Sequence, residues 1–111
     1  MTLTKNRSRG TPEDEGKGLQ AFRLYVTAAS PISARAIVNA RRFMELRLPG
    51  AHRLEVLDIA DNIQLAIADE IIACPTLVRV VPPPARRFIG DLSDVSTLEV
   101  SLGLPPAGEL P

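Results

Sequence analysis

The sequence predicts a small α/β protein in which a mixed β-sheet is covered by helices, with the element order βαβαββα. Two observations favour this fold. Strand-like and helix-like patterns of apolar residues alternate along the first part of the chain. Further along, three consecutive prolines separate two short apolar runs: Pro82, Pro83 and Pro84. Because proline fixes φ and lacks an N–H donor, this run predicts a stiff, extended connection between two strands.

The first three elements are expected to form a βαβ unit. Residues 22–26 alternate like a strand with one face more apolar than the other. Ser30 followed by Pro31 predicts a helix start, because the serine oxygen can cap free N–H groups and proline suits the first helical position. Residues 53–59 alternate again and predict a strand buried on much of both faces. The helix between these strands is expected to end near residue 48 and to bury Ala34, Ile37, Val38, Met44 and Leu48.

The second half completes the predicted layout. A helix is expected to begin at Asp61, as its cap, and to reach residue 72. Strands are expected over residues 77–81 and 86–89, on either side of the prolines, and a last helix begins at Ser93 or Asp94. The resulting order matches a thioredoxin-like layout, a small mixed sheet with helices on its faces.

The length of 111 residues allows one domain, which is expected over residues 19–104. Residues 1–18 are polar, charged and glycine-containing, so they predict a disordered N-terminal arm. Residues 105–111 are rich in proline and have little to bury, so they predict a flexible C-terminal tail.

Charge and composition argue against several classes of function. Thirteen basic and thirteen acidic residues give a formal net charge of zero, so strong nucleic-acid binding is not expected. The sequence has no apolar run of the roughly 20 residues that span a bilayer, and no secretory leader is visible. A cytoplasmic protein is expected. Every basic residue after residue 19 is arginine, which suits a protein interface or reflects compositional bias.

The residues that could carry catalysis do not form a recognisable set. His52 is the only histidine, and no partner stands at a metal-ligand spacing, so neither a metal nor a cofactor is expected. We expect His52 to be a solvated loop residue. Asp58 and Asp61 are interpreted as a strand end and a helix cap rather than an acid–base pair. The sequence therefore predicts no enzyme.

Cys74 is the single cysteine, which excludes an internal disulfide or a dithiol redox pair. It precedes Pro75, at the position where thioredoxin-like folds usually carry a cis-proline beside the active site. One hypothesis is a one-cysteine redox or thiol-sensing protein. The favoured interpretation is a small, buried apolar side chain.

A longer motif surrounds the three prolines. Pro75-Thr76-Leu77 precedes them, and the block from Pro82 to Ser93 contains Arg-Arg, Gly90 and Asp91. Matching residues elsewhere are Leu24-Tyr25-Val26, Ser30-Pro31 with Ser33 and Arg35, Asp58-Ile59, and Asn62 with Gln64-Leu65. On these motifs, which cover about residues 21–104, the chain resembles the KaiB family.

KaiB proteins are non-enzymatic members of the bacterial circadian clock that bind the N-terminal ATPase ring of KaiC and help to sequester KaiA where it exists. The resemblance implies a clock or timer regulator that modulates the phosphorylation state of a KaiC-type ATPase. It also implies structural roles for Pro75, Pro82, Pro83, Pro84 and Gly90. The partner-binding residues that it implies are Asn62, Gln64, Leu65, Glu70, Pro75, Arg86, Arg87 and Asp91.

The family exchanges between two folds. In the resting state, a dimer or tetramer, the second half folds as βααβ, which gives βαββααβ overall. The state that binds KaiC is a thioredoxin-like monomer. The resemblance therefore implies a homo-oligomer at rest and a change of fold on binding.

Three departures from the family pattern bear on the partners. Glu70 and Glu55 each stand where lysine is common, and Ser101-Leu102-Gly103 replaces a common Gly-Leu-Asp. Glu55 lies on the strand associated with KaiA, so KaiA is a doubtful partner. A divergent KaiC in a simpler timer or stress response fits these changes. A further hypothesis is the sensor domain of a histidine kinase. The short length of the chain argues against it.

Overall fold

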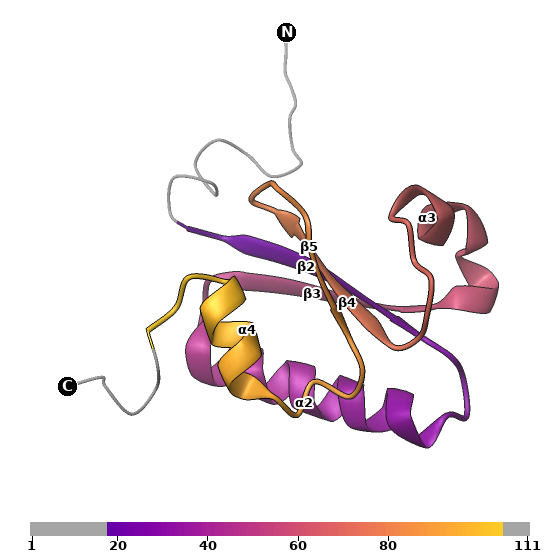
Figure 1. Cartoon of the computed structure of the whole chain (residues 1–111), viewed down its shortest axis with the longest axis horizontal. Helices are drawn as coiled ribbons and strands as arrows, with labels where there is room; N and C mark the ends of the chain where they lie inside the picture. The colour runs from indigo at the N-terminus through magenta and orange to yellow at the C-terminus, as the bar shows by residue number, and fades with distance from the viewer. Residues whose placement is uncertain (1–17, 106–111) are drawn as a thin grey trace, which may run out of the picture.

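The protein is described by a computed structural model that covers residues 18–105 (Figure 1). Four strands form one sheet in the order β3-β2-β4-β5. β3 runs parallel to β2, whereas β4 pairs antiparallel with both β2 and β5. The strand bounds are β2 (Gln20–Val26), β3 (His52–Asp58), β4 (Thr76–Val81) and β5 (Arg86–Ile89). The predicted arm and tail lie outside the described residues, except for positions 18 and 105.

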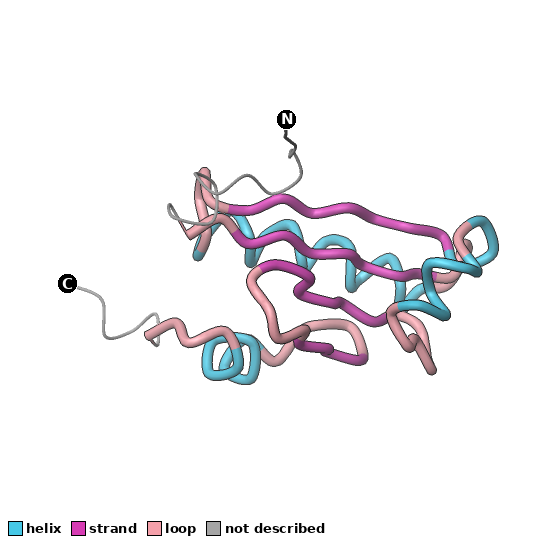
Figure 2. Tube along the Cα trace, turned by 90° about the horizontal axis from the view of Figure 1, so that it is seen from above, coloured by secondary structure: helices cyan, strands magenta, loops and turns pink. Residues whose placement is uncertain are grey.

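Within residues 18–105, three α-helices pack against the sheet: α2 (Pro31–Arg47), α3 (Ile63–Ala68) and α4 (Val95–Ser101). A short 3-10 helix, η1 (Ile59–Asp61), precedes α3. The larger core joins α2 and α4 to one face of the sheet through Phe22, Leu24, Phe43, Leu77 and Leu98. A smaller cluster joins α3 to the opposite face through Tyr25, Leu57, Ala66 and Val78. Figure 2 shows the strands side by side, with α3 at one end of the sheet.

The predicted order βαβαββα is confirmed, with η1 added before the second helix. The three prolines connect β4 to β5 as expected. Ser30 caps α2, because its Oγ accepts a hydrogen bond from the Ser33 N–H at 3.2 Å. Asp94 caps α4 in the same manner through the Thr97 N–H at 3.2 Å.

The buried face of α2 differs from the prediction. Ala34 and Val38 are exposed, and Val38 keeps 53% of its surface in solvent. The helix instead packs small residues against the sheet, where they permit close approach. Its buried residues are Ser33, Ala36, Ala40, Phe43 and Met44.

β3 is less buried than the prediction of burial on much of both faces. It is an edge strand of the sheet, in which Leu57 is the one fully buried residue and Leu54 and Val56 are partly buried against the larger core. A period-two pattern of apolar residues does not distinguish a central strand from an edge strand, because position in the sheet depends on the whole topology.

The second helix is also shorter than expected. Asp58 caps η1 by accepting from the Ala60 N–H at 2.9 Å, whereas Asp61 lies within η1 and caps no α-helix. The break follows from Asn62, whose φ of −138° is not helical. The helix that begins at Ile63 then ends at Ala68 rather than at residue 72.

Candidate protein-interaction surface

The outer side of α3 and of the turn that follows it is apolar. Ile63, Ile67 and Ile72 are 55%, 65% and 87% exposed. Directly beneath them Ala66 is buried and Leu65 is partly buried against the smaller core cluster. We call the residues of this region the α3 surface: the exposed Ile63, Gln64, Ile67, Glu70 and Ile72, with the half-buried Asn62 at its edge. Exposed isoleucines gathered on one short element are typical of a contact surface.

α3 ends in a Schellman motif. The Ile71 N–H donates to the Ala66 carbonyl at 2.9 Å, and the Glu70 N–H donates to the Ile67 carbonyl at 3.0 Å. This geometry gives Glu70 a φ of +60°, in the left-handed region that usually favours glycine. The motif turns the chain sharply and leaves the Glu70 side chain exposed on the α3 surface.

Asp69 ties this turn to the sheet. Its carboxylate accepts two hydrogen bonds from Arg23 Nη1, at 2.9 and 3.2 Å, and one from the Tyr25 hydroxyl at 2.5 Å. Its carbonyl accepts a hydrogen bond from Arg87 Nε at 2.9 Å. Arg87 also forms an ion pair with Glu70 at 3.4 Å. The end of α3 is therefore held against β2 and β5 by the bonds that Asp69 accepts from Arg23, Tyr25 and Arg87.

Two side chains in this network have shifted pKa values. Burial and the hydrogen bond to Asp69 raise the pKa of Tyr25 well above its ordinary value, so the phenol stays protonated and keeps donating. Burial alone would lower the pKa of Arg23, but the hydrogen bond and the charge of Asp69 outweigh it and raise that pKa. The raised pKa values keep the Tyr25 phenol and the Arg23 guanidinium protonated throughout the physiological pH range.

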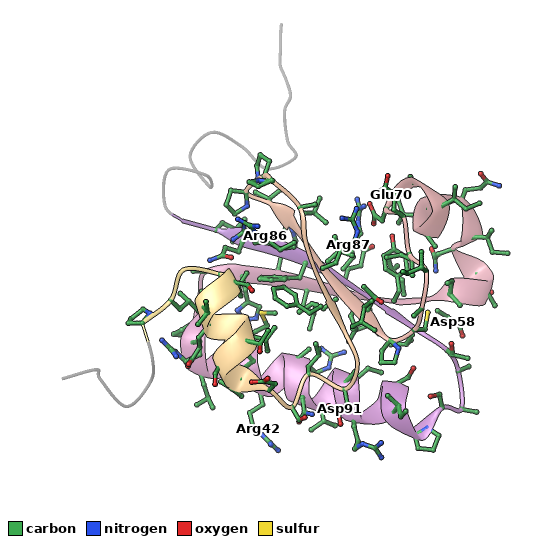
Figure 3. The ribbon with its side chains drawn as sticks, viewed as in Figure 1. Arg42, Asp58, Glu70, Arg86, Arg87 and Asp91 are labelled. Atoms are coloured by element: carbon green, nitrogen blue, oxygen red, sulfur yellow. The ribbon has the colours of Figure 1, made fainter. Side chains whose placement is uncertain are left out.

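The structure brings together only part of the predicted partner-binding set. Asn62, Gln64, Leu65 and Glu70 lie on or under the α3 surface, and Arg87 joins them through Glu70. Arg86 and Arg87 extend to opposite sides of β5, as neighbours on a strand do (Figure 3). Arg86 is therefore separated from the α3 surface.

Asp91 lies in the loop after β5, away from Glu70 and next to α2 (Figure 3). It forms an ion pair with Arg35 at 3.6 Å, and its carbonyl accepts from the Asn39 side chain at 2.8 Å. Hydrogen bonds from Ser93, followed by the charge of Arg35, lower the pKa of the Asp91 carboxyl. These contacts attach the loop to α2.

The remaining predicted positions have contacts within the fold. Pro75 is buried and follows a cis peptide bond, and its carbonyl accepts from the Gly90 N–H at 3.0 Å. Gly90 has a φ of +115°, a conformation that side chains rarely adopt. Cys74 is half-buried and packs against the cluster around Tyr25. With no second cysteine in the chain, this setting gives the redox hypothesis no support.

The prediction for His52 is wrong. It begins β3 rather than lying in a solvated loop, and its side chain is only 17% exposed. Its Nδ1 lies 2.7 Å from the Leu48 carbonyl oxygen, at the end of α2. Within residues 18–105, no three His, Cys, Asp or Glu side chains form a group that could hold a metal ion. None of the helices described there has the length and apolar character needed to cross a bilayer.

Sequence reasoning missed the network around Asp69. One signal was present, because a tyrosine on a largely apolar strand needs a hydrogen-bond partner for its hydroxyl when it is buried. The identity of that partner was not predictable, since Asp69 is 44 residues away from Tyr25 in sequence.

Comparison with solved structures defines the class of fold. The protein is similar to chloroplastic thioredoxin z, with a TM-score of 0.61 at 14% identity over 79% of this chain and 81% of that chain. It is also similar to the N-terminal domain of Synechococcus elongatus SasA, with a TM-score of 0.65 at 15% identity over 99% of each chain. The fold is therefore thioredoxin-like, as predicted.

The family follows from sequence. The KaiB domain model matches residues 23–104. The circadian clock oscillator protein KaiB of Prochlorococcus marinus (strain MIT 9313) is 45% identical over 83 residues, which cover 75% of this chain and 70% of that protein. KaiB of Microcystis aeruginosa is 41% identical over 88 residues, or 79% and 85% of the two chains. This chain belongs to the KaiB family of circadian clock proteins.

Proposed function

We propose that this protein is a non-catalytic clock or timer regulator that binds a KaiC-type ATPase ring and modulates the phosphorylation state of that ATPase. Membership of the KaiB family supports the proposal. The observation that assigns binding to a particular surface is the group of exposed isoleucines on α3 and on the turn after it: Ile63, Ile67 and Ile72. Its site is the α3 surface together with Arg87, with the partly buried Leu65 beneath it and the buried Pro75 just before β4.

The chemistry of this surface suits a protein partner. Apolar side chains at the centre of an interface lose contact with water, while polar groups at the rim set orientation. Gln64 supplies an exposed neutral polar group beside the isoleucines, and Glu70 with Arg87 supplies an exposed ion pair. Asn62 is half-buried, and its Nδ2 donates to the Asp58 carbonyl at 2.8 Å. Because Glu70 stands where the family commonly has lysine, the matching position of the ATPase is expected to be basic or neutral.

The proposal includes a change of fold. In it, the thioredoxin-like arrangement binds the ATPase, and a resting dimer or tetramer folds its second half as βααβ. The α3 surface belongs to that second half, so it would be assembled only in the thioredoxin-like state. Binding would then draw the population toward this state, because a partner stabilises the conformation that it binds.

The same proposal places the protein in the cytoplasm and does not require KaiA. Glu55 on the edge strand β3 is exposed and lies 3.9 Å from Arg23. A carboxylate at this edge would repel a partner that normally meets a lysine there. The expected system is therefore a KaiC-type ATPase without KaiA.

A pair of matched substitutions tests the proposed surface. Ile67→Ser removes an exposed side chain from the α3 surface, and Leu46→Ser removes one from the far side of α2 that is 70% exposed. We expect Ile67→Ser to weaken binding to the cognate KaiC-type ATPase by about tenfold or more. Leu46→Ser should bind like the unmodified protein. Equal affinities for both variants, measured after overnight incubation with ATP, would contradict the assignment of this surface.

A further inference from the structure

Two arginines face each other across the last two strands. Arg79 of β4 stands directly opposite Arg86 of β5 in the sheet register. Arg79 is only 7% exposed, whereas Arg86 is exposed. Like charges at opposed positions of an antiparallel pair destabilise the sheet. A negative charge nearby would therefore stabilise this pair.

No such charge is provided by the described residues. The ion pairs within residues 18–105 involve neither arginine. Arg79 Nη2 donates one hydrogen bond, 3.3 Å long, to the neutral carbonyl of Pro84. Its Nε is buried and has no hydrogen-bond partner. Burial and then the charge of Arg86 lower the pKa of Arg79, which is the expected response of an uncompensated cation.

The connection beside this pair supplies little compensation. Pro82, Pro83 and Pro84 are exposed and carry no side-chain acceptor, so they offer Arg79 only backbone carbonyls, of which that of Pro84 accepts its hydrogen bond. A buried guanidinium without a counter-charge is unfavourable, whereas two guanidinium groups suit bidentate binding of an oxyanion.

We propose that Arg79 and Arg86 form a binding site for an oxyanion group, a carboxylate or a phosphate, at the base of the triple-proline loop. The site lies on the opposite side of β5 from Arg87 and does not depend on the function proposed above. Two sources of the anion fit the same chemistry. One is an external anion or a partner's acidic group, and the other is the acidic run Glu13-Asp14-Glu15 of this chain.

The internal source is within reach of the site. Ala21 of β2 pairs with Val81, so the chain enters the sheet beside the triple-proline loop. The acidic run ends three residues before Gly18, which has a φ of +80°. Ala21 is six positions after Glu15, and an extended chain of that length spans roughly 20 Å.

Titration of the full-length chain with sodium phosphate tests the site. The Nε–Hε resonance of Arg79 is followed by NMR, with sodium chloride at matched ionic strength as the reference. Phosphate is expected to shift this resonance saturably, and Arg86→Gln should raise the phosphate Kd by about tenfold or more. Arg42→Gln, an exposed arginine on α2 far from the site, should leave the Kd unchanged (Figure 3).

The variant E13Q/D14N/E15Q separates the two sources. A response to phosphate in the unmodified protein and the variant alike supports an external anion. A response that appears or strengthens only in the variant supports occupation by the acidic run. Absence of a saturable response in both proteins, or a response that survives Arg86→Gln unchanged, would overturn the proposal.

Discussion

At the scale of single residues, Asp69 is the most connected side chain of the α3 region. One carboxylate accepts from Arg23 and Tyr25, and the carbonyl of the same residue accepts from Arg87. A carboxylate in this setting stabilises the fold mainly because the groups around it would be left without partners if it were removed. The position of the α3 surface therefore depends on a residue that lies beneath it.

Replacement of Asp69 measures this dependence. We expect Asp69→Ala to lower the free energy of unfolding by about 2–3 kcal/mol, because the Tyr25 hydroxyl and the Arg23 guanidinium lose their acceptor. Glu55→Gln removes only an exposed charge pair with Arg23 and should cost less than about 1 kcal/mol. Urea unfolding of the monomeric, thioredoxin-like form, followed by circular dichroism, gives both values. Similar costs for the two variants would refute a structural role for Asp69.

The left-handed conformation of Glu70 makes a second prediction. A residue with a side chain pays about 1–2 kcal/mol in this conformation, part of which glycine avoids. Glu70→Gly is therefore expected to stabilise the thioredoxin-like state by about 0.5–1 kcal/mol. Glu70→Ala removes the same charge but keeps the strain, so it should give no gain. Thermal unfolding compares the two, and a gain in both would point to charge rather than backbone strain.

At the scale of elements, α3 and α4 end in the same way with different residues. Gly103 follows α4 with a φ of +73°, and the Leu104 N–H donates to the Glu99 carbonyl at 2.8 Å. α4 is joined to α2 by a buried ion pair between Arg47 and Glu99, whereas α3 contacts a smaller core cluster. The α3 end of the molecule is accordingly expected to open more easily.

The stability of the first turn of α4 should depend on pH. Hydrogen bonds from the side chain and backbone of Thr97 lower the pKa of Asp94 in the folded protein. A lowered folded-state pKa means that the stabilisation is present above the unfolded pKa, near 4, and is lost as pH falls through the folded value. The protection factor of the Thr97 amide, which compares its exchange rate with that of an unstructured chain at the same pH, is expected to fall over that acidic range. Asp94→Asn keeps the cap without the titration, so a similar fall in that variant would contradict this cause.

Short sequence signals predicted where helices begin better than they predicted how the elements pack against one another. Ser30-Pro31 and Asp94 marked helix starts correctly, because capping depends on a few neighbouring residues. The edge position of β3 and the early end of α3 were not predicted. Each depends on contacts between distant segments, such as the pairing of β2 with β4 and the bond between Tyr25 and Asp69.

At the scale of the whole molecule, the two faces of the sheet have unequal cover. α2 and α4 pack over the larger core, whereas α3 covers the smaller cluster at one end of the opposite face (Figure 1). The sequence predicted the thioredoxin-like layout and the family, because the proline block and its flanking motif are specific. It did not predict that Arg86 and Arg87 face different sides, which requires the register of β5.

The proposed function requires that this thioredoxin-like arrangement be the one that binds a KaiC-type ATPase. The most direct test is size-exclusion chromatography with light scattering on the pure protein, alone and after prolonged incubation with its cognate ATPase and ATP. We expect a dimer or tetramer alone, and a ring complex that carries single copies of this chain after incubation. A chain that stays monomeric and never joins the ring, even after many hours, would contradict the proposal.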